Sequence, residues 1–129
     1  MEPPLSRHLA ARSIVKRGTE RVLDVDPEDL VAGFKVRYVS PGKIDGLAAI
    51  HCLTTYGRKH HVPADEIWIA SDLKRYTPIL AMHEAVEHRL RQMGYNYYSS
   101  HDMAIEMEWR RFGGTKLYDE YLEATMETV

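Results

Sequence analysis

Residues 83–109 read HEAVEHRLRQMGYNYYSSHDMAIEMEW, and this stretch predicts two helices joined by a tight turn. The first helix is expected to end at Gly94, because glycine is typical of the position just past a helix end. Ser99 or Ser100 can cap the second helix, which reaches about Phe112. A short turn makes the two helices antiparallel neighbours, so their facing side chains should meet.

The first helix carries a His-Glu pair that is typical of metal sites. At 100° per residue, its apolar residues form one stripe, with His83 and Glu87 on the flank of that stripe. Glu84 stands beside them, whereas His88 is expected on the side opposite the core. An H-E-x-x-H helix places two metal ligands and a general base in this same arrangement. Here Glu87 supplies a carboxylate where that motif has its second imidazole.

The second helix places two polar side chains in the middle of its apolar face. These are His101 and Glu108, whereas Asp102, Glu106 and Arg110 are expected to point elsewhere. Burying an imidazole and a carboxylate is costly unless they are paired, hydrogen-bonded or bound to a metal. The pattern therefore indicates a polar cluster between the helices.

Folding the hairpin should bring His101 toward Glu87 and Glu108 toward His83. His83, Glu87 and His101 suit Zn²⁺ with one open coordination position, and Fe²⁺ or Mn²⁺ accept the same ligand types. Glu108 is either a fourth metal ligand or a carboxylate that orients a histidine. The alternative is a buried His–Glu hydrogen-bond network that only fixes the hairpin.

The rest of the chain predicts an α+β fold. Residues 1–129 are expected to form one domain, with an N-terminal helical segment (1–30), strands (34–70), the metal-site hairpin (77–112) and a C-terminal helix (115–127). The strands should form a small antiparallel sheet packed on the hairpin.

Three segments carry the strand pattern, at 34–39, 48–57 and 66–70. His51 lies in the second of them. It can reach the hairpin site only if that strand packs on the hairpin.

Composition argues against some classes of partner. The net charge of −2 and the isoelectric point near 6.4 give no electrostatic reason to expect a nucleic acid. No apolar run has the length of a membrane span, and the N-terminus lacks the apolar core of a signal peptide. The single cysteine, Cys52, fits a reducing cytosol, so a cytoplasmic protein is expected.

The motif of the hairpin resembles one found in small proteins of bacteria and their phages that look like reduced relatives of zincin metallopeptidases. Their pattern is HExxE followed by G-x-x-Y-x-x-x-H-x-x-A-x-x-x-E, matched here by His83, Glu84, Glu87, Gly94, Tyr97 or Tyr98, His101, Ala104 and Glu108. The resemblance covers roughly residues 66–112. It implies a zincin-like minimal core, in which the strand 66–70 runs beside the active-site helix and pairs with extended substrate.

Two functions follow as expectations. In the first, a metal-activated water, with Glu84 as general base, attacks the carbonyl of a peptide or of a small amide or ester. Tyr97, Tyr98 or a nearby histidine would then stabilise the oxyanion. In the second, the protein is a non-catalytic interaction or assembly module whose hairpin holds a structural metal or a His–Glu network. The sequence specifies neither the substrate nor the oligomeric state.

Overall fold

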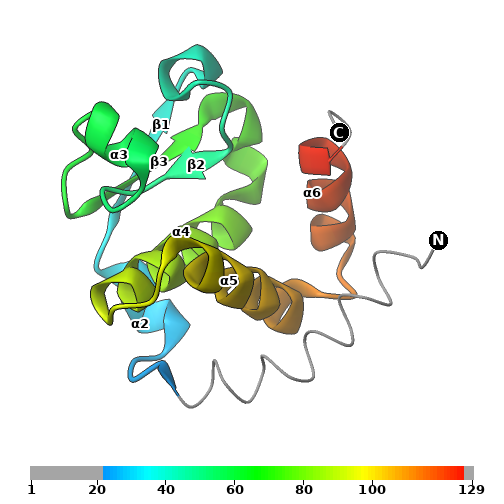
Figure 1. The fold of residues 1–129 in the computed structure, drawn as a ribbon. Helices are drawn as coiled ribbons and strands as arrows, with labels where there is room; N and C mark the ends of the chain where they lie inside the picture. Colours follow the sequence, from blue (N-terminus) through cyan, green and yellow to red (C-terminus); the bar gives the residue numbers. More distant parts are fainter. Residues whose placement is uncertain (1–21, 127–129) are drawn as a thin grey trace.

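The computed structural model describes residues 22–126, and it has the α+β fold predicted from the sequence (Figure 1). Most of the expected N-terminal helical segment, 1–30, lies outside the described residues. The elements are α2 (Pro27–Ala32), β1 (Lys35–Val39), η1 (Pro41–Ile44), β2 (Ala49–Ile50), α3 (Thr55–Lys59), β3 (Glu66–Ala70), η2 (Ser71–Tyr76), α4 (Thr77–Gln92), α5 (Tyr97–Phe112) and α6 (Lys116–Met126).

The three strands form a mixed sheet in the order β1-β3-β2. β3 pairs in parallel with β1, in the register Lys35–Glu66 to Val39–Ala70, and antiparallel with β2. The prediction of an antiparallel sheet is therefore wrong for the β1–β3 pair. Residues 40–65 connect these strands and include η1, β2 and α3, which gives the long crossover that a parallel pair needs.

The second strand is much shorter than the segment 48–57 predicted from the sequence. It ends at Ile50, and the chain turns into α3. The Thr54 side chain caps α3 by accepting the Gly57 N–H at 2.8 Å. Cap chemistry thus overrides the strand propensity of the residues that follow Ile50.

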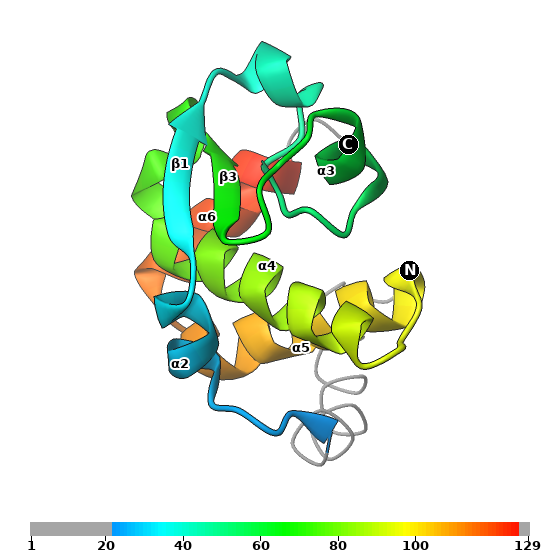
Figure 2. The ribbon, with the colours of Figure 1, turned by 90° about the vertical axis from the view of Figure 1, so that its left-hand side faces the viewer.

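Helix α4 lies at the centre of the structure (Figure 2). The sheet covers one side of it, with Ile67 packed near Ile79, and α5 covers another, with Ala104 near Leu90. Helix α2 packs on it as well. The expectation of one buried stripe is therefore too narrow: His88, predicted to face away from the core, is only 7% exposed.

A similar correction applies to α5. Glu106, which was expected to point away from the buried face, is 5% exposed. The buried surface of α5 is therefore wider than its apolar face. Asp102 remains exposed, as predicted.

The turn between α4 and α5 forms a Schellman motif. Gly94 has a φ of 102°, its N–H donates to the Arg91 carbonyl, and the Tyr95 N–H donates to the Leu90 carbonyl. The predicted helix stop at Gly94 is thus confirmed. The cap of α5 is Asn96, whose side chain accepts the Ser99 N–H at 2.8 Å, so the prediction of Ser99 or Ser100 as the cap is wrong.

Helix α6 confirms the expected C-terminal helix and adds two tyrosines to the core. Tyr118 is fully buried and Tyr121 is nearly so, and both pack in the cluster that includes Ile69 and Leu80. Within residues 22–126, no helix combines the length and the apolarity needed to cross a bilayer.

Candidate metal centre

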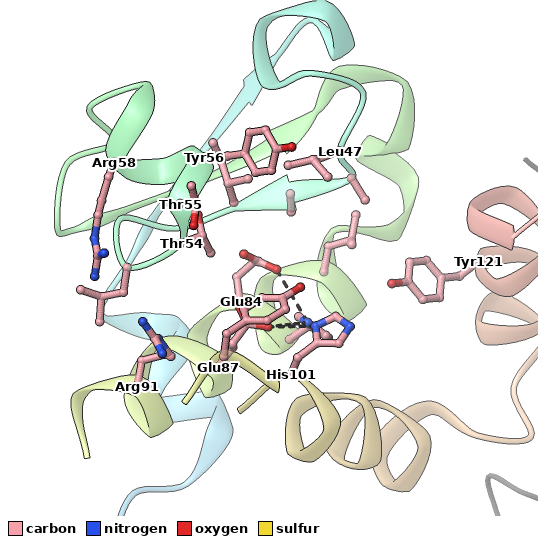
Figure 3. Close-up of a pocket in the computed structure, with 17 residues that line it drawn as sticks. Leu47, Thr54, Thr55, Tyr56, Arg58, Glu84, Glu87, Arg91, His101 and Tyr121 are labelled. Atoms are coloured by element: carbon pink, nitrogen blue, oxygen red, sulfur yellow. Dashed lines mark hydrogen bonds and ion pairs between the residues drawn. The ribbon is translucent and has the colours of Figure 1, made fainter. Parts of the chain in front are cut away.

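The predicted convergence of α4 and α5 is present in the structure. His83 Nε2 lies 3.3 Å from Glu87 Oε2, and His101 Nδ1 lies 3.0 Å from the same oxygen. One ligand atom from each of these three residues lies within 4.8 Å of the other two. Figure 3 shows Glu87 and His101 meeting in the pocket above the hairpin.

These separations fit the ligand shell of a metal ion. Bonds of about 2.1 Å in a tetrahedral site place neighbouring ligand atoms about 3.4 Å apart. The two separations from Glu87 Oε2 are 3.3 Å and 3.0 Å. An ion held at this spacing would require the 3.0 Å separation between His101 Nδ1 and Glu87 Oε2 to widen slightly.

Glu108 orients His83 from behind. Its Oε2 contacts His83 Nδ1, and its Oε1 accepts a hydrogen bond from the Tyr118 hydroxyl at 3.4 Å. With Nδ1–H donating to Glu108, Nε2 is turned toward Glu87 and the pocket. This is the arrangement in which a carboxylate holds a metal-binding histidine. The geometry places Glu108 in this supporting position and not beside the three ligand atoms.

The charges of the cluster follow from its burial and its pairing. Burial disfavours the imidazolium, but Glu108, Glu87 and Glu84 together outweigh it and raise the pKa of His83 well above its usual value. For Glu87, burial is likewise outweighed: hydrogen bonds from His101, His51 and His83 hold the pKa of this carboxyl well below its usual value. Glu87 is therefore ionised at neutral pH.

His51 is the site residue that the sequence did not assign. It is fully buried, and its Nε2 lies 2.8 Å from Glu87 Oε1. Its Nδ1 accepts the backbone N–H of Leu53 at 3.1 Å, so Nδ1 carries the lone pair and Nε2 carries the proton. In this tautomer Nε2–H donates to Glu87, and neither ring nitrogen is free to bind a metal.

This tautomer bears on a second possible metal group, which consists of His51, Glu84 and Glu87. The three side chains are close enough to share an ion, but a metal at His51 Nε2 would need a proton on Nδ1. That proton would point at the Leu53 N–H. His51 therefore holds the far oxygen of Glu87 and leaves Oε2 to the ligand cluster.

The backbone around His51 is packed tightly against α3. A Cβ added to Gly57 would lie 1.7 Å from the His51 carbonyl oxygen, so only glycine allows this approach. The Thr54 hydroxyl donates to the same carbonyl at 2.9 Å. A glycine three residues after a helix cap is the only local signal in the sequence for this contact.

Glu84 has an oxygen without a partner at the edge of the cluster. It is 6% exposed, and its Oε1 has no hydrogen-bond partner within the described part of the chain. Its Oε2 lies 3.9 Å from His83 Nε2. Burial raises the pKa of Glu84 above its usual value. Glu84 itself lines the pocket, beside Glu87 and His101 (Figure 3).

His88 lies behind the site and does not join it. Its Nε2 is 3.5 Å from Cys52 Sγ, and its ring packs edge-on against His51 and Phe34. Burial, with His51 and Arg89 nearby, lowers the pKa of His88 to about 4. A neutral His88 therefore acts as packing beneath His51.

The cluster forms one wall of a pocket of about 440 Å³. Tyr97 lines the pocket and stacks on the His101 ring, with centroids 5.4 Å apart and an interplanar angle of 17°. Burial, together with Glu87 and Glu84, raises the pKa of Tyr97, so its hydroxyl stays protonated. Tyr98, the other predicted oxyanion donor, is 77% exposed and does not line the pocket.

Comparison with protein-family models, with curated proteins and with solved structures finds no match to this chain. The resemblance of the motif to zincin-like proteins stays a prediction.

Proposed function

We propose that this protein is a metal-dependent hydrolase of zincin type, with His83 Nε2, Glu87 Oε2 and His101 Nδ1 as the metal ligands. The observation that carries the proposal is the convergence of these three atoms beside a buried carboxylate with a free oxygen. Zn²⁺ suits two imidazoles and one carboxylate, and Fe²⁺ or Mn²⁺ are the other candidates. A bound ion of this kind supplies a water of lowered pKa and polarises a carbonyl group.

Glu84 is the proposed general base. Its free Oε1 accepts a proton from the attacking water and later delivers it to the leaving nitrogen or oxygen. Burial raises the pKa of this carboxyl above its usual value, which is the direction that favours a general base that also returns the proton.

The other residues of the cluster position the reacting groups. Glu108 fixes the ring of His83, and His51 fixes the carboxylate of Glu87. The Tyr97 hydroxyl is the proposed donor to the oxyanion that forms as an amide or ester carbonyl is attacked. Peptides and small amides or esters are the proposed substrates.

The first test is metal content, measured by elemental mass spectrometry on tag-free protein after reconstitution with Zn²⁺. We expect about one ion per chain in the wild type and a loss of that ion in His101→Ala. His60→Ala is the matched control, since His60 bonds to Asp45 outside the pocket. Equal metal content in wild type and His101→Ala would refute the assignment.

A substrate screen then separates catalysis from binding. In Glu84→Gln, the metal content should be unchanged and hydrolysis should fall by about 10²–10⁴-fold, the usual contribution of a general base. Hydrolysis that survives this change would show that Glu84 is not the base.

A second candidate function is a non-catalytic interaction or assembly module. The observation that favours it is that Glu87 accepts hydrogen bonds from three imidazoles, which satisfies both oxygens without a metal. A site of this kind fixes the hairpin through a His–Glu network or a structural ion. In that case, chelation either changes nothing or unfolds the domain, whereas an open catalytic site loses its ion and stays folded.

A further inference from the structure

Two arginines line the same pocket as the proposed metal ligands. Arg58 comes from α3 and Arg91 from the last turn of α4. Figure 3 shows the two guanidinium groups on one side of the pocket and Tyr121 on the opposite side. Glu87 and His101 lie in the middle, between the arginines and Tyr121. The pocket therefore has a cationic end and, beyond the ligand cluster, an aromatic end.

Within the part of the chain that the structure describes, the charge of these two arginines is not neutralised. Neither Arg58 nor Arg91 has a carboxylate partner in residues 22–126. Arg91 donates a long hydrogen bond of 3.5 Å to the Tyr95 carbonyl. Other arginines in the same part of the chain do form ion pairs, namely Arg37 with Glu66, Arg75 with Glu120, Arg89 with Asp24 and Arg111 with Glu28. A pair of unneutralised arginines at a pocket is thus a local feature of the site.

The charge balance of the pocket favours an anionic ligand once a metal is bound. Among the lining residues, Arg58 and Arg91 offset the charges of Glu84 and Glu87. With Glu108, which contacts His83, counted as a third carboxylate, a divalent ion at the ligand cluster leaves one positive charge in excess. The remaining walls include apolar side chains, such as Leu47 and Leu80, which cannot neutralise it.

We infer that the substrate of this site carries a carboxylate, which Arg58 and Arg91 bind while the scissile carbonyl lies at the ligand cluster. The planar guanidinium group matches a carboxylate through two parallel hydrogen bonds, and a second arginine adds charge. The apolar part of the substrate then lies toward Leu80 and Tyr121. This inference rests on the proposed function, because it needs an open metal site to hold the carbonyl.

The test uses hydroxamates, which bind an exposed metal directly. Monohydroxamates of the straight-chain dicarboxylic acids from malonic to adipic acid are titrated into the zinc-loaded protein by calorimetry. Each is compared with the methyl-ended hydroxamate of the same chain length. For at least one length, we expect the carboxylate to improve binding about tenfold, which corresponds to 1.4 kcal/mol.

Two variants test whether the arginines cause this preference. The ratio of the affinities for the carboxylate-ended and the methyl-ended hydroxamate should fall at least about fivefold in Arg58→Gln and in Arg91→Gln. Each variant loses one charged hydrogen-bond donor. Arg37→Gln is the matched control: it removes the same charge from β1, outside the pocket, and should keep the preference. Circular dichroism checks that each variant is folded.

The outcomes separate this inference from the proposed function. If both members of every pair bind the zinc-loaded protein equally, the metal site stands and the carboxylate subsite is wrong. A preference that survives in both pocket variants, or that disappears equally in Arg37→Gln, also overturns the subsite. If no hydroxamate binds at all, the open metal site itself is refuted, and the carboxylate subsite falls with it.

Discussion

Replacing His51 with leucine should weaken metal binding without changing its stoichiometry. The substitution removes the Nε2–H donor that lies 2.8 Å from Glu87 Oε1, and it keeps a side chain of apolar bulk in a fully buried position. Glu87 then has an unpaired oxygen and more freedom to rotate. Because His51 lies behind a proposed ligand and is not itself a proposed ligand, the variant should still bind about one ion per chain.

The size of the effect follows from two independent estimates. A hydrogen bond to a charged group contributes about 1.5–3 kcal/mol. Loss of a group that orients a metal ligand typically lowers metal affinity about 10–100-fold, which is about 1.4–2.8 kcal/mol. The two ranges agree, so an increase in the dissociation constant of about 10–100-fold is expected for His51→Leu.

The assay is a competition titration of Zn²⁺ against a chromophoric chelator. His51→Gln is the rescue variant, because its amide N–H can take the place of Nε2–H and should recover most of the affinity. His60→Leu is the control, since His60 pairs with Asp45 outside the pocket. Circular dichroism of the metal-free proteins separates weakened binding from loss of fold.

Two results would refute the reasoning. If the wild type binds two ions and His51→Leu binds one, His51 is a ligand and the tautomer derived from the Leu53 contact is wrong. If His51→Leu binds the metal as tightly as the wild type, the hydrogen bond to Glu87 does not position that carboxylate.

Three further predictions concern pH and packing. Because the pKa of His83 is raised in the metal-free protein, a metal ion that binds to His83 must displace a proton. Zinc affinity should therefore fall as the pH drops through that raised pKa. Calorimetry in buffers of different ionisation enthalpy should detect the released proton. His88 has its pKa lowered from 6.5 to about 4, so the fold favours the neutral ring and loses stability as pH falls from 6.5 to 4. After a discount for solvent screening, about 1–2 kcal/mol should disappear over this range, and urea titrations of His88→Gln should show a flatter pH profile. Gly57→Ala forces α3 away from the His51 carbonyl and should lower the unfolding free energy by more than about 2 kcal/mol. Gly42→Ala is the control, because a Cβ at that position meets open space, and it should lower the unfolding free energy little in the same urea titration.

The helical part of the site was predictable from the sequence because it depends on local geometry. Positions four apart on α4 and the central positions of α5 gave both cross-helix pairs, His101 with Glu87 and His83 with Glu108. The Schellman glycine at the turn fixed the antiparallel arrangement. These are contacts within one hairpin, and periodicity carries enough information to place them.

The rest of the site depends on contacts between distant segments, which periodicity does not report. His51 and Glu87 are 36 residues apart in the chain, and their contact follows from the short strand β2 and the turn into α3. His88 was placed on an exposed face because a helix wheel assumes a single buried side. Helix α4 is instead covered by the sheet, α2 and α5, so side chains around most of its circumference are buried.

His51 also offers a physical reason why a carboxylate can stand where an H-E-x-x-H helix has its second histidine. An anionic ligand gives more charge to a metal than an imidazole does, which weakens the metal as a Lewis acid. A proton donor on the far oxygen of Glu87 withdraws part of that charge and keeps the near oxygen directed at the cluster. The double variant Glu87→His, His51→Leu tests this reasoning, because an imidazole at position 87 no longer needs the donor. Its metal affinity should exceed that of His51→Leu alone; equal or weaker binding would show that the Glu87–His51 pair has some other role.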